Sequence, residues 1–152
     1  MLDPIPDQFN LADYFLDHNI RDGRGDKVAV YYRDEKWTYA QIQEGACRAA
    51  GAFRSLGVRQ EDRVLLILPD CPAFVTALFG VHKAGAVLAM VNPLLPIEDF
   101  VYYFNYTRAV TAVVHHSLVE GLTKLRPQLK YVKNLLVAGG DPGPFLSYEQ
   151  TC

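Results

Sequence analysis

The stretch Asp62–Ala89, DRVLLILPDCPAFVTALFGVHKAGAVLA, predicts a strand, a helix and a second strand in that order. Val64–Leu68 and Val87–Val91 are short, unbroken apolar runs, which are typical of strands buried on both faces. Pro72 suits the first turn of the helix between them, because its missing N–H would have no helical partner there. Gly85 can adopt the left-handed conformation that ends a helix. The stretch is therefore a βαβ unit, and the rest of the chain extends it.

The same alternation of apolar strands and helical spacers continues after this unit. A helix is expected to begin near Glu98, and strands are expected at Val110–Val114 and Leu135–Val137, with a helix at Leu118–Leu125 between them. Helical crossovers between apolar strands imply parallel pairing, with helices flanking the sheet. The sequence thus predicts an α/β fold, and we expect at least three of the four apolar runs to be parallel neighbours in one sheet.

A small β-hairpin is predicted before the α/β unit. Val28–Tyr32 and Trp37–Tyr39 are rich in β-branched and aromatic residues. The polar residues Arg33–Lys36 between them predict a loop longer than the tightest hairpin turns. Thr38 and Gln41 have the spacing of a capping box, so a helix should begin directly after the hairpin.

Short sequence patterns at both ends of the chain predict an extended arm and the starts of two helices. Met1–Phe9 is expected to form an extended arm, and Asn10 can cap a helix that follows it. Leu146–Gln150 resembles the opening of another helix, with Ser147 as its N-cap. Because the sequence stops at Cys152, inside that expected helix, we expect the chain to be truncated.

The composition excludes several classes of protein. The chain has 152 residues, half of them hydrophobic, which is enough for one domain with a sizeable core. Its net charge is −2 with both signs interspersed, which argues against a nucleic-acid partner. Three cysteines without a framework spacing favour reduced intracellular thiols. The first residues do not resemble a signal peptide, and no apolar run approaches the ~20 residues that span a bilayer. We therefore expect no membrane partner and a cytoplasmic location.

Ligands of open parallel sheets collect beyond the carboxyl ends of the strands. These ends are expected at Pro69–Asp70, Asn92–Pro93, His115–His116 and Ala138–Gly140. His115–His116 could act as a base or as a metal pair, but neighbouring side chains on a strand point to opposite faces. The two histidines are therefore not expected to chelate a metal together, and the edge of a loop is the favoured interpretation.

Four further patterns have a structural interpretation beside a functional one. Gly139–Asp141 could cradle a phosphate, but no lysine, serine or threonine follows it as in a phosphate loop, so a turn is favoured. Gly80–Gly85 has phosphate-loop spacing, but Ala86 stands where lysine is required. Cys71 could have a pKa lowered by a helix dipole, although an inert thiol is favoured. The aromatic residues in Tyr102–Tyr106 could stack on bases, but a mixture of core and surface residues is favoured.

Three segments resemble a known enzyme family. Trp37–Tyr39 followed by Gln41–Ile42 resembles the family's first signature, an aromatic-rich strand followed by a helix. His82–Ala86 followed by Asn92–Pro93 resembles the second signature, and Phe9–Phe15 is similar to the opening of the aryl branch. On these residues, nearly the whole chain resembles the N-terminal part of adenylate-forming (AMP-binding) acyl/aryl-CoA ligases, most like benzoate-CoA ligases. Residues 1–152 are then expected to be the truncated first portion of that family's large N-terminal domain.

The resemblance implies an enzyme that activates a small aromatic carboxylic acid with ATP. An acyl-adenylate forms first, and coenzyme A then displaces AMP, with Mg²⁺ and phosphate-loop donors stabilising the phosphate charge. The family's phosphate loop, its adenylate-binding segments and its catalytic lysine are not found in this sequence. The resemblance therefore assigns no catalytic residue and no metal ligand here. It implies that the remainder of the ligase chain is the partner, and that this chain alone is inactive and binds none of these cofactors.

One loop is a candidate for cofactor binding. In some halobenzoate-type relatives a basic residue in the loop that corresponds to Asn92, Pro93 and Leu94 meets a phosphate of coenzyme A. Leu94 occupies that basic position and cannot make the contact. Related sequences often carry prolines at the positions of Leu88 and Met90, so the loop is expected to be reshaped. The alternative interpretation is a rigid turn, because prolines commonly mark turns.

The sequence is compatible with three functions. The chain is a fragment of an aryl-CoA ligase, a complete small α/β protein that binds a ligand at the strand ends, or a non-catalytic interaction module derived from such a ligase. A fragment should expose apolar surface where the missing part packs, at the Tyr102–Tyr106 face and after Leu135. We therefore expect the isolated chain to self-associate and to lack carboxylate-dependent pyrophosphate exchange.

Overall fold

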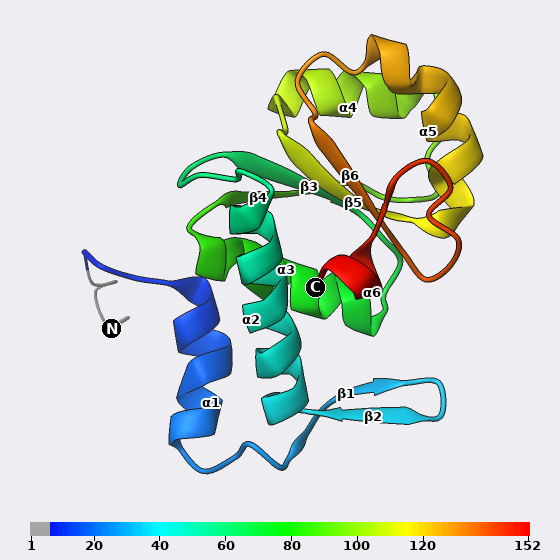
Figure 1. The fold of residues 1–152 in the computed structure, drawn as a ribbon. Coiled ribbons are helices and arrows are strands. Elements are labelled where there is room, and N and C mark those ends of the chain that lie inside the picture. The colour runs from blue at the N-terminus through cyan, green and yellow to red at the C-terminus, as the bar shows by residue number, and fades with distance from the viewer. Residues whose placement is uncertain (1–6) are drawn as a thin grey trace.

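A five-stranded sheet forms the centre of the molecule. The computed structural model describes residues 7–152, so the arm expected at Met1–Phe9 lies largely outside the described residues. All neighbouring strands of the sheet are parallel, in the order β4-β3-β5-β6-β7 (Figure 1). The strands are β3 (Arg63–Ile67), β4 (Val87–Met90), β5 (Thr111–His115), β6 (Asn134–Ala138) and β7 (Leu146–Ser147). The prediction of a parallel sheet is confirmed, because all four apolar runs lie in it.

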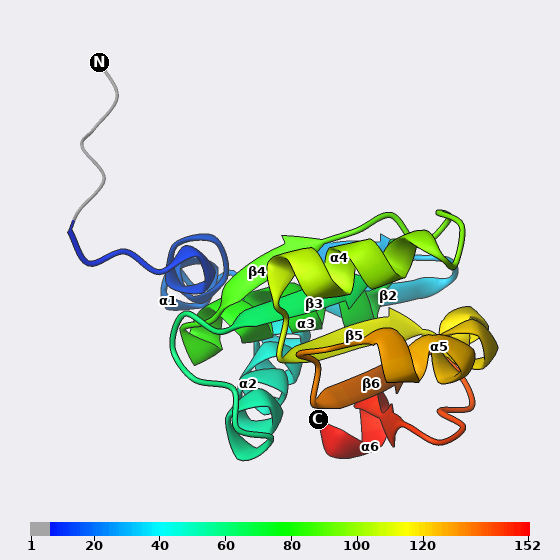
Figure 2. The same cartoon turned by 90° about the horizontal axis from the view of Figure 1, so that it is seen from above.

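Helices cover both faces of the sheet, as the two views in Figures 1 and 2 show. One face carries α2 (Tyr39–Ser55) and α3 (Pro72–Ala84), and the other carries α4 (Asp99–Thr107) and α5 (Val119–Leu125). Along β3, Val64 and Leu66 pack on the α2 and α3 side, whereas Leu65 and Ile67 pack on the α4 and α5 side. None of these four side chains is exposed. The apolar run in β3 is unbroken because both of its faces are covered.

Glycines let α2 and α3 approach each other closely. A Cβ built on Gly45 of α2 would lie 2.6 Å from Thr76 of α3. A Cβ on Gly80 of α3 would likewise lie 2.6 Å from the Cβ of Ala49 of α2. Gly85 ends α3 in the left-handed conformation, with φ of 76°. Gly80 and Gly85 therefore serve helix packing and helix termination, which confirms that their spacing is not a phosphate loop.

The predicted hairpin is present as β1 (Val28–Tyr32) and β2 (Glu35–Thr38), and it lies apart from the main sheet (Figure 1). The expected long loop is wrong. Tyr32 pairs with Glu35, so the loop consists of Arg33 and Asp34 alone. Arg33 adopts a positive φ of 52°, which two-residue hairpin turns require. Glu35 and Lys36 look like loop residues in the sequence, but an exposed two-stranded ribbon tolerates charged side chains within its strands.

Side-chain caps set the starts of two helices. The capping box at α2 is confirmed: Thr38 Oγ1 accepts from Gln41 N at 3.2 Å, and Thr38 N donates to Gln41 Oε1 at 2.8 Å. Tyr39 therefore begins α2 instead of ending β2. Ser147 caps α6 (Tyr148–Thr151) as expected, but Leu146 lies in β7 and not in a helix. A strand of two residues has no pattern of its own, and only its pairing with β6 reveals it.

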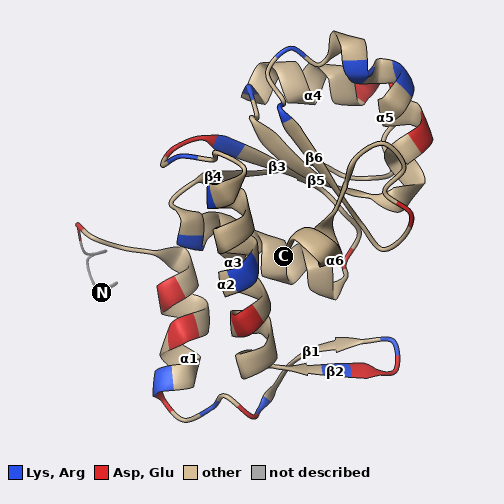
Figure 3. Ribbon diagram, in the orientation of Figure 1, with Lys and Arg blue, Asp and Glu red and all other residues tan. Residues whose placement is uncertain are grey.

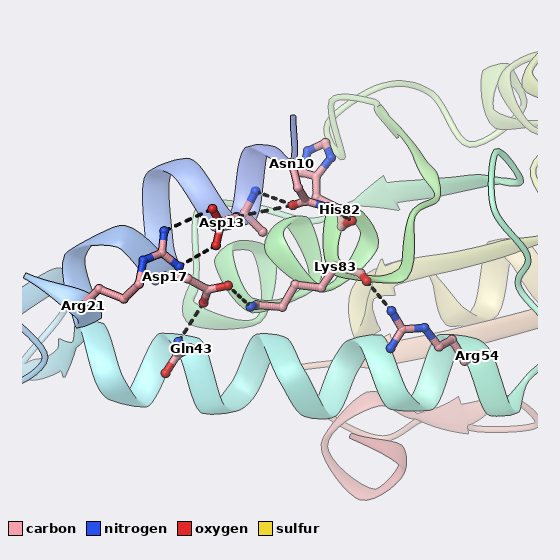
Figure 4. A network of polar contacts seen from close by, with 9 residues as sticks. Asn10, Asp13, Asp17, Arg21, Gln43, Arg54, His82 and Lys83 are labelled. Atoms are coloured by element: carbon pink, nitrogen blue, oxygen red, sulfur yellow. Dashed lines mark hydrogen bonds and ion pairs between the residues drawn. The ribbon is translucent and has the colours of Figure 1, made fainter. Parts of the chain in front are cut away.

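A polar network holds the N-terminal helix against the C-terminal end of α3 (Figure 4). This helix consists of a π-helical turn, Asp13–Asp17, followed by α1 (His18–Arg21). Asn10 caps it, as expected, by accepting from Ala12 N at 2.9 Å. Lys83 Nζ lies 2.5 Å from Asp17 Oδ2, and Gln43 Nε2 donates to Asp17 Oδ1 at 2.7 Å. The two side chains of the Asp17–Lys83 pair are only 20% and 15% exposed, so the pair is well shielded from water.

Charged residues of both signs lie on the helices, the hairpin and the loops, whereas the central strands β5 and β6 carry none (Figure 3). This distribution matches the interspersed charges of the sequence and shows no extended basic stripe on the ribbon. Within residues 7–152, no helix has both the length and the apolar character needed to cross a membrane.

Candidate functional site

The order of the strands places a topological switch point between β3 and β5. The chain leaves β3 through α3 and reaches β4 on one side of β3. It then returns through α4 to β5 on the other side. The two crossovers cover opposite faces of the sheet, so a crevice forms beyond the carboxyl ends of β3 and β5. Open α/β sheets commonly bind ligands in this crevice.

A cavity of about 480 Å³ opens at this switch point. Its floor is formed by Pro69 after β3, His115–His116 after β5 and Ala138–Gly139 after β6. Three of the four expected strand ends are thus brought together, while Asn92–Pro93 after β4 is not among the lining residues. The opposite wall comes from the hairpin, with Trp37, and from the side of α2. The strand ends do not predict this second wall, because it depends on how the hairpin packs.

The two histidines lie side by side, with their ring centroids 4.3 Å apart. The expectation that they point to opposite faces is wrong, because His116 begins a 3₁₀ turn and the alternation of the strand stops at His115. Two glycines make room for the rings. A Cβ on Gly140 would lie 2.7 Å from His116 Cγ, and one on Gly139 would lie 3.6 Å from His115 Nε2. The loop-edge interpretation holds, but both rings face the cavity region.

Hydrogen bonds set the tautomer of His115. Its Nδ1 lies 2.8 Å from Ser117 Oγ and accepts from Ser117 N at 3.4 Å. A proton on Nε2 satisfies this arrangement, so Nε2–H is a free donor. Burial lowers the pKa of His115, and the neighbouring His116 lowers it further. At neutral pH the His115 ring is therefore uncharged.

The glycine turn after β6 is held by a carboxylate. Gly139 N donates to Glu149 Oε1 at 2.9 Å, and Gly139 adopts a left-handed φ of 83°. A phosphate at this turn would meet the negative charge of Glu149 and would have to displace it. The turn interpretation of Gly139–Asp141 is therefore confirmed, and this segment is not a phosphate cradle.

A buried hydrogen bond links α6 to α3 beside the cavity. Tyr148 Oη lies 2.8 Å from Thr76 Oγ1, and Tyr148 is only 5% exposed. Burial raises the pKa of Tyr148 well above its usual range, although the bond to Thr76 opposes that shift. The phenol is therefore a neutral structural group that fixes one corner of the cavity.

Two of the three thiols line the cavity. Burial raises the pKa of the Cys71 thiol, and burial raises the pKa of Cys152 to about 11. The helix start at Cys71 therefore does not activate its thiol, and the interpretation of an inert cysteine is supported. Cys47 lies on α2, is exposed, and does not line the cavity.

The loop after β4 has a compact backbone. Asn92 Oδ1 accepts from Leu94 N at 2.9 Å, and the Leu94 side chain is 88% exposed. This side-chain bond supports a rigid turn, while a role of Asn92, Pro93 and Leu94 in coenzyme A binding stays a prediction.

The donor set of the described residues does not fit a nucleoside triphosphate with its metal ion. Within residues 7–152, no group of three or more His, Cys, Asp or Glu side chains could hold a metal ion. No lysine lines the cavity, and its glycine turn is already bonded to Glu149. We therefore derive no chemical step through ATP, Mg²⁺ or coenzyme A from these residues.

The aromatic side chains within Tyr102–Tyr106 on α4 are partly buried and partly exposed, as expected. Phe104 is buried against the sheet, whereas Tyr102 and Tyr106 are 61% and 73% exposed. The two tyrosine rings stack, with centroids 5.3 Å apart. They form part of the surface of the molecule. The helix that carries them, α4, lies on the side of the sheet away from the hairpin (Figure 1).

Comparison with known proteins gives consistent matches. Residues 16–150 match the family described as AMP-binding enzyme. The chain is 26% identical to 4-hydroxybenzoate–CoA/benzoate–CoA ligase of Rhodopseudomonas palustris, over 94% of this chain and 26% of the relative. It is 33% identical to benzoate–CoA ligase of Thauera aromatica, over 90% of this chain and 26% of the relative. The crystal structure of anthranilate CoA ligase AuaEII superposes with a TM-score of 0.89 at 28% identity, over 97% of this chain and 28% of that one. The chain thus spans about a quarter of the length of these relatives.

Proposed function

The chain belongs to the AMP-binding enzyme family, and from that premise we propose that it is part of an ATP-dependent aryl (benzoate-type) carboxylate–CoA ligase. The observation that carries the proposal is the match over residues 16–150, together with relatives that are ligases of benzoate and hydroxybenzoate. The same parallel sheet and flanking helices occur in a solved anthranilate CoA ligase. Residues 1–152 are, in this proposal, the first portion of the large N-terminal domain.

The complete enzyme would convert a small aromatic acid into an acyl-adenylate and then into an acyl-CoA. ATP and Mg²⁺ would be held by parts of the ligase outside these residues, since the donor set here does not fit them. The contribution of this chain is then architectural: its sheet carries the parts that bind the reactants. Binding energy that is not directed at the transition state cannot raise the rate, so the sheet alone should not catalyse.

Pyrophosphate exchange tests this proposal. We expect residues 1–152 to show no exchange above a protein-free control with benzoate or substituted benzoates. A chain that continues through the downstream phosphate loop and C-terminal lysine should exchange pyrophosphate in a carboxylate-dependent way. Exchange by the short chain that survives repurification would contradict the proposal, and so would a continuing reading frame that encodes no phosphate loop.

The strand-end loop has a separate role in the proposal. We expect Asn92, Pro93 and Leu94 to lie near coenzyme A in the complete enzyme, and a basic residue to improve coenzyme A binding. Leu94→Arg in the full-length ligase should therefore lower the KM for coenzyme A and leave the KM for the acid unchanged. An unchanged KM for coenzyme A would exclude the loop from that role.

The second candidate function is a small non-catalytic α/β binding or interaction module derived from such a ligase. The exposed Tyr102 and Tyr106 pair favours a surface that associates with another polypeptide. In either case, we expect the isolated chain to self-associate, which sedimentation velocity over a range of concentrations can measure. A clean monomer at high concentration would count against an uncovered packing surface.

A further inference from the structure

We propose that the groove between α4 and α5 binds the acidic, proline-containing N-terminal segment, residues 1–8, of a second copy of this chain. The inference rests on the self-association expected above and deepens it, because it names the surface and the segment that this surface binds. It does not require the chain to be part of a ligase. Three features carry it: a pair of stacked tyrosines, positive charge beside the groove, and a segment of complementary chemistry.

The groove runs along α4 and has a volume of about 580 Å³. Its two sides are formed by α4, with Val101, Tyr102, Asn105 and Tyr106, and by Leu125 and Gln128 of the segment that follows in the chain. Asn105 Nδ2 donates to Gln128 O at 3.0 Å, so a hydrogen bond joins the two sides. The groove is therefore a fixed feature of this face of the molecule.

Two stacked rings supply the aromatic surface of the groove. The centroids of the Tyr102 and Tyr106 rings lie 5.3 Å apart, with 16° between the ring planes. Both side chains are mostly exposed, although they lie on the same helix as the buried Phe104. Proline-containing segments commonly dock on grooves lined by aromatic rings, because proline has little conformational freedom to lose on binding. Tyrosine is also enriched at the centres of protein interfaces.

Positive charge lies beside the lining residues without an ion-pair partner. The backbone N–H of Lys130 donates to Oδ1 of Asn105 at 2.9 Å, and Arg126 directly follows a lining residue of α5. Arg108 ends α4, whereas Glu98, the one acid in the lining, precedes its first turn. Within residues 7–152, none of these three cations forms an ion pair. Figure 3 shows basic residues around α4 and α5, so this face attracts an acidic segment.

The N-terminal segment has the complementary chemistry. Residues 3–7 read acid, proline, isoleucine, proline, acid, and the first lysine or arginine of the sequence is Arg21. Asp3 and Asp7 can pair with the cations beside the groove, while the prolines suit the tyrosine rings. Five residues in a polyproline conformation cover about 12 Å, and α4, with nine residues, covers about 13 Å. The segment therefore matches the groove in charge and in length.

The sheet separates this segment from the groove of its own chain. Asn10 Nδ2 donates to His82 O at 2.8 Å, and Asp17 pairs with Lys83, so the N-terminal helix lies against the end of α3. The groove lies on the opposite face, which carries α4 and α5 (Figures 1 and 2). A second copy presents its segment without this obstacle, and reciprocal exchange of two segments closes a symmetric dimer.

A synthetic peptide tests the segment directly. The probe is MLDPIPDQF, residues 1–9 of this sequence, and the matched peptide carries Asp3→Lys and Asp7→Lys. Sedimentation velocity of the chain over a range of concentrations measures the monomer–dimer equilibrium. Saturating acidic peptide should dissociate the dimer, whereas the basic peptide should not. A dimer that withstands the acidic peptide, or that yields equally to both peptides, would overturn the proposal.

Two tyrosines of equal exposure test the groove. Tyr106 lines the groove and Tyr31 lies on the hairpin, and both are 73% exposed. Tyr106→Ala should raise the dissociation constant of the dimer about tenfold, the effect expected for an aromatic anchor of an interface. Tyr31→Ala should leave the dissociation constant unchanged. Equal changes in the two variants would exclude the groove as the binding surface.

An exchange of charges distinguishes direct pairing from an effect of net charge. The pair of changes Arg108→Glu and Lys130→Glu should weaken the dimer, and so should Asp3→Lys with Asp7→Lys. The chain that carries all four changes has the original net charge and again has opposite charges on the segment and the groove. We therefore expect it to dimerise like the unaltered chain, and a failure to recover would contradict direct pairing.

The matched control for the groove cations is Lys27→Glu with Lys36→Glu. Both lysines are exposed, lie directly before β1 and within β2, and form no ion pair within residues 7–152. This control changes the net charge equally and should leave the dimer intact. Circular dichroism checks the fold of every variant, and added salt should weaken the dimer of the unaltered chain without any substitution.

A chain that stays monomeric at every accessible concentration would overturn the proposal, and so would equal losses in the groove and control pairs. A dimer that added salt leaves unchanged would do the same. Failure of the ligase proposal would leave these measurements unaffected, because none of them uses pyrophosphate exchange.

Discussion

Leu66 in the sheet and Lys83 at the end of α3 represent two ways in which this chain holds its parts together. Leu66 has no exposed surface and contacts apolar side chains on one face of the sheet. Lys83 at the end of α3 forms an ion pair with Asp17 of the N-terminal helix (Figure 4). This pair holds the helix in place, since the helix buries few residues of its own. The sheet is therefore stabilised by area removed from water, while the N-terminal helix depends on a few directional contacts.

Leu66→Ala should produce the largest loss and should affect the whole molecule. Removing a fully buried leucine side chain leaves a cavity between the sheet and the α2 and α3 layer. We expect the free energy of unfolding to fall by about 3–5 kcal/mol. Urea denaturation followed by circular dichroism measures this change. A loss below about 1 kcal/mol would mean that the sheet core is not the principal source of stability.

Lys83→Met should have a smaller and more local effect. The change leaves Asp17 shielded from water with only Gln43 as a partner. We expect a loss of about 1–2 kcal/mol, seen in hydrogen exchange as lower protection of residues 11–21. Protection of β3 and β5 should hardly change.

The matched control for that prediction is Lys124→Met. Lys124 and Glu120 form an exposed ion pair one helical turn apart, with side chains 72% and 85% exposed. Such pairs contribute little, so this variant should leave exchange unchanged. If Lys83→Met and Lys124→Met change hydrogen exchange equally, burial does not make the Asp17–Lys83 ion pair more stabilising than the exposed Glu120–Lys124 pair.

Tyr148 should make the free energy of unfolding depend on pH. Its pKa is raised in the folded state by burial, so the folded chain holds its proton when the unfolded chain has lost it. The contribution of Tyr148 to stability is therefore fully present below pH 10 and is lost as pH rises above that value, by up to about 1.4 kcal/mol per pH unit. Cys71 and Cys152, whose pKa values are also raised, add to the loss above pH 9. Tyr148→Phe should reduce the slope of stability against pH between pH 10 and 11, and an unchanged slope would contradict the assignment.

Among the destabilising variants, Thr38→Ala should have the smallest effect. It removes one half of the capping box at the start of α2, where Thr38 Oγ1 accepts from Gln41 N. Loss of an N-cap costs about 1 kcal/mol. Thermal unfolding should shift by a few degrees, whereas Thr38→Ser should retain the cap and most of the stability.

Local patterns were sufficient for much of the fold. The apolar run at Val64–Leu68, the capping pair Thr38 and Gln41, and Gly85 at the end of α3 all act within a few residues, so the sequence predicts them directly. The prediction failed at Leu146 and at the hairpin loop. Leu146 is a strand residue only because β6 lies beside it, and Glu35 joins β2 only because Tyr32 pairs with it.

The candidate site was predicted in part for the same reason. The carboxyl ends of β3, β5 and β6 follow from the parallel order, so His115, His116 and Gly139 were expected near a ligand. Arg33 and Trp37 were not expected there, since they are far away in the sequence and no local signal connects them to the strand ends. Their position depends on how the hairpin packs after α2 begins.

By itself, the sequence determined the βαβ alternation and the helix caps, because these depend on side-chain periodicity and on residues close together in the chain; the family came from the resemblance of its motifs. Only the tertiary structure decided which strand ends meet, that His115 and His116 lie side by side, and that the hairpin closes a cavity over them. The physical reason is that local free energies act over a few residues. The cavity instead arises from packing between elements that are separated by up to about a hundred residues.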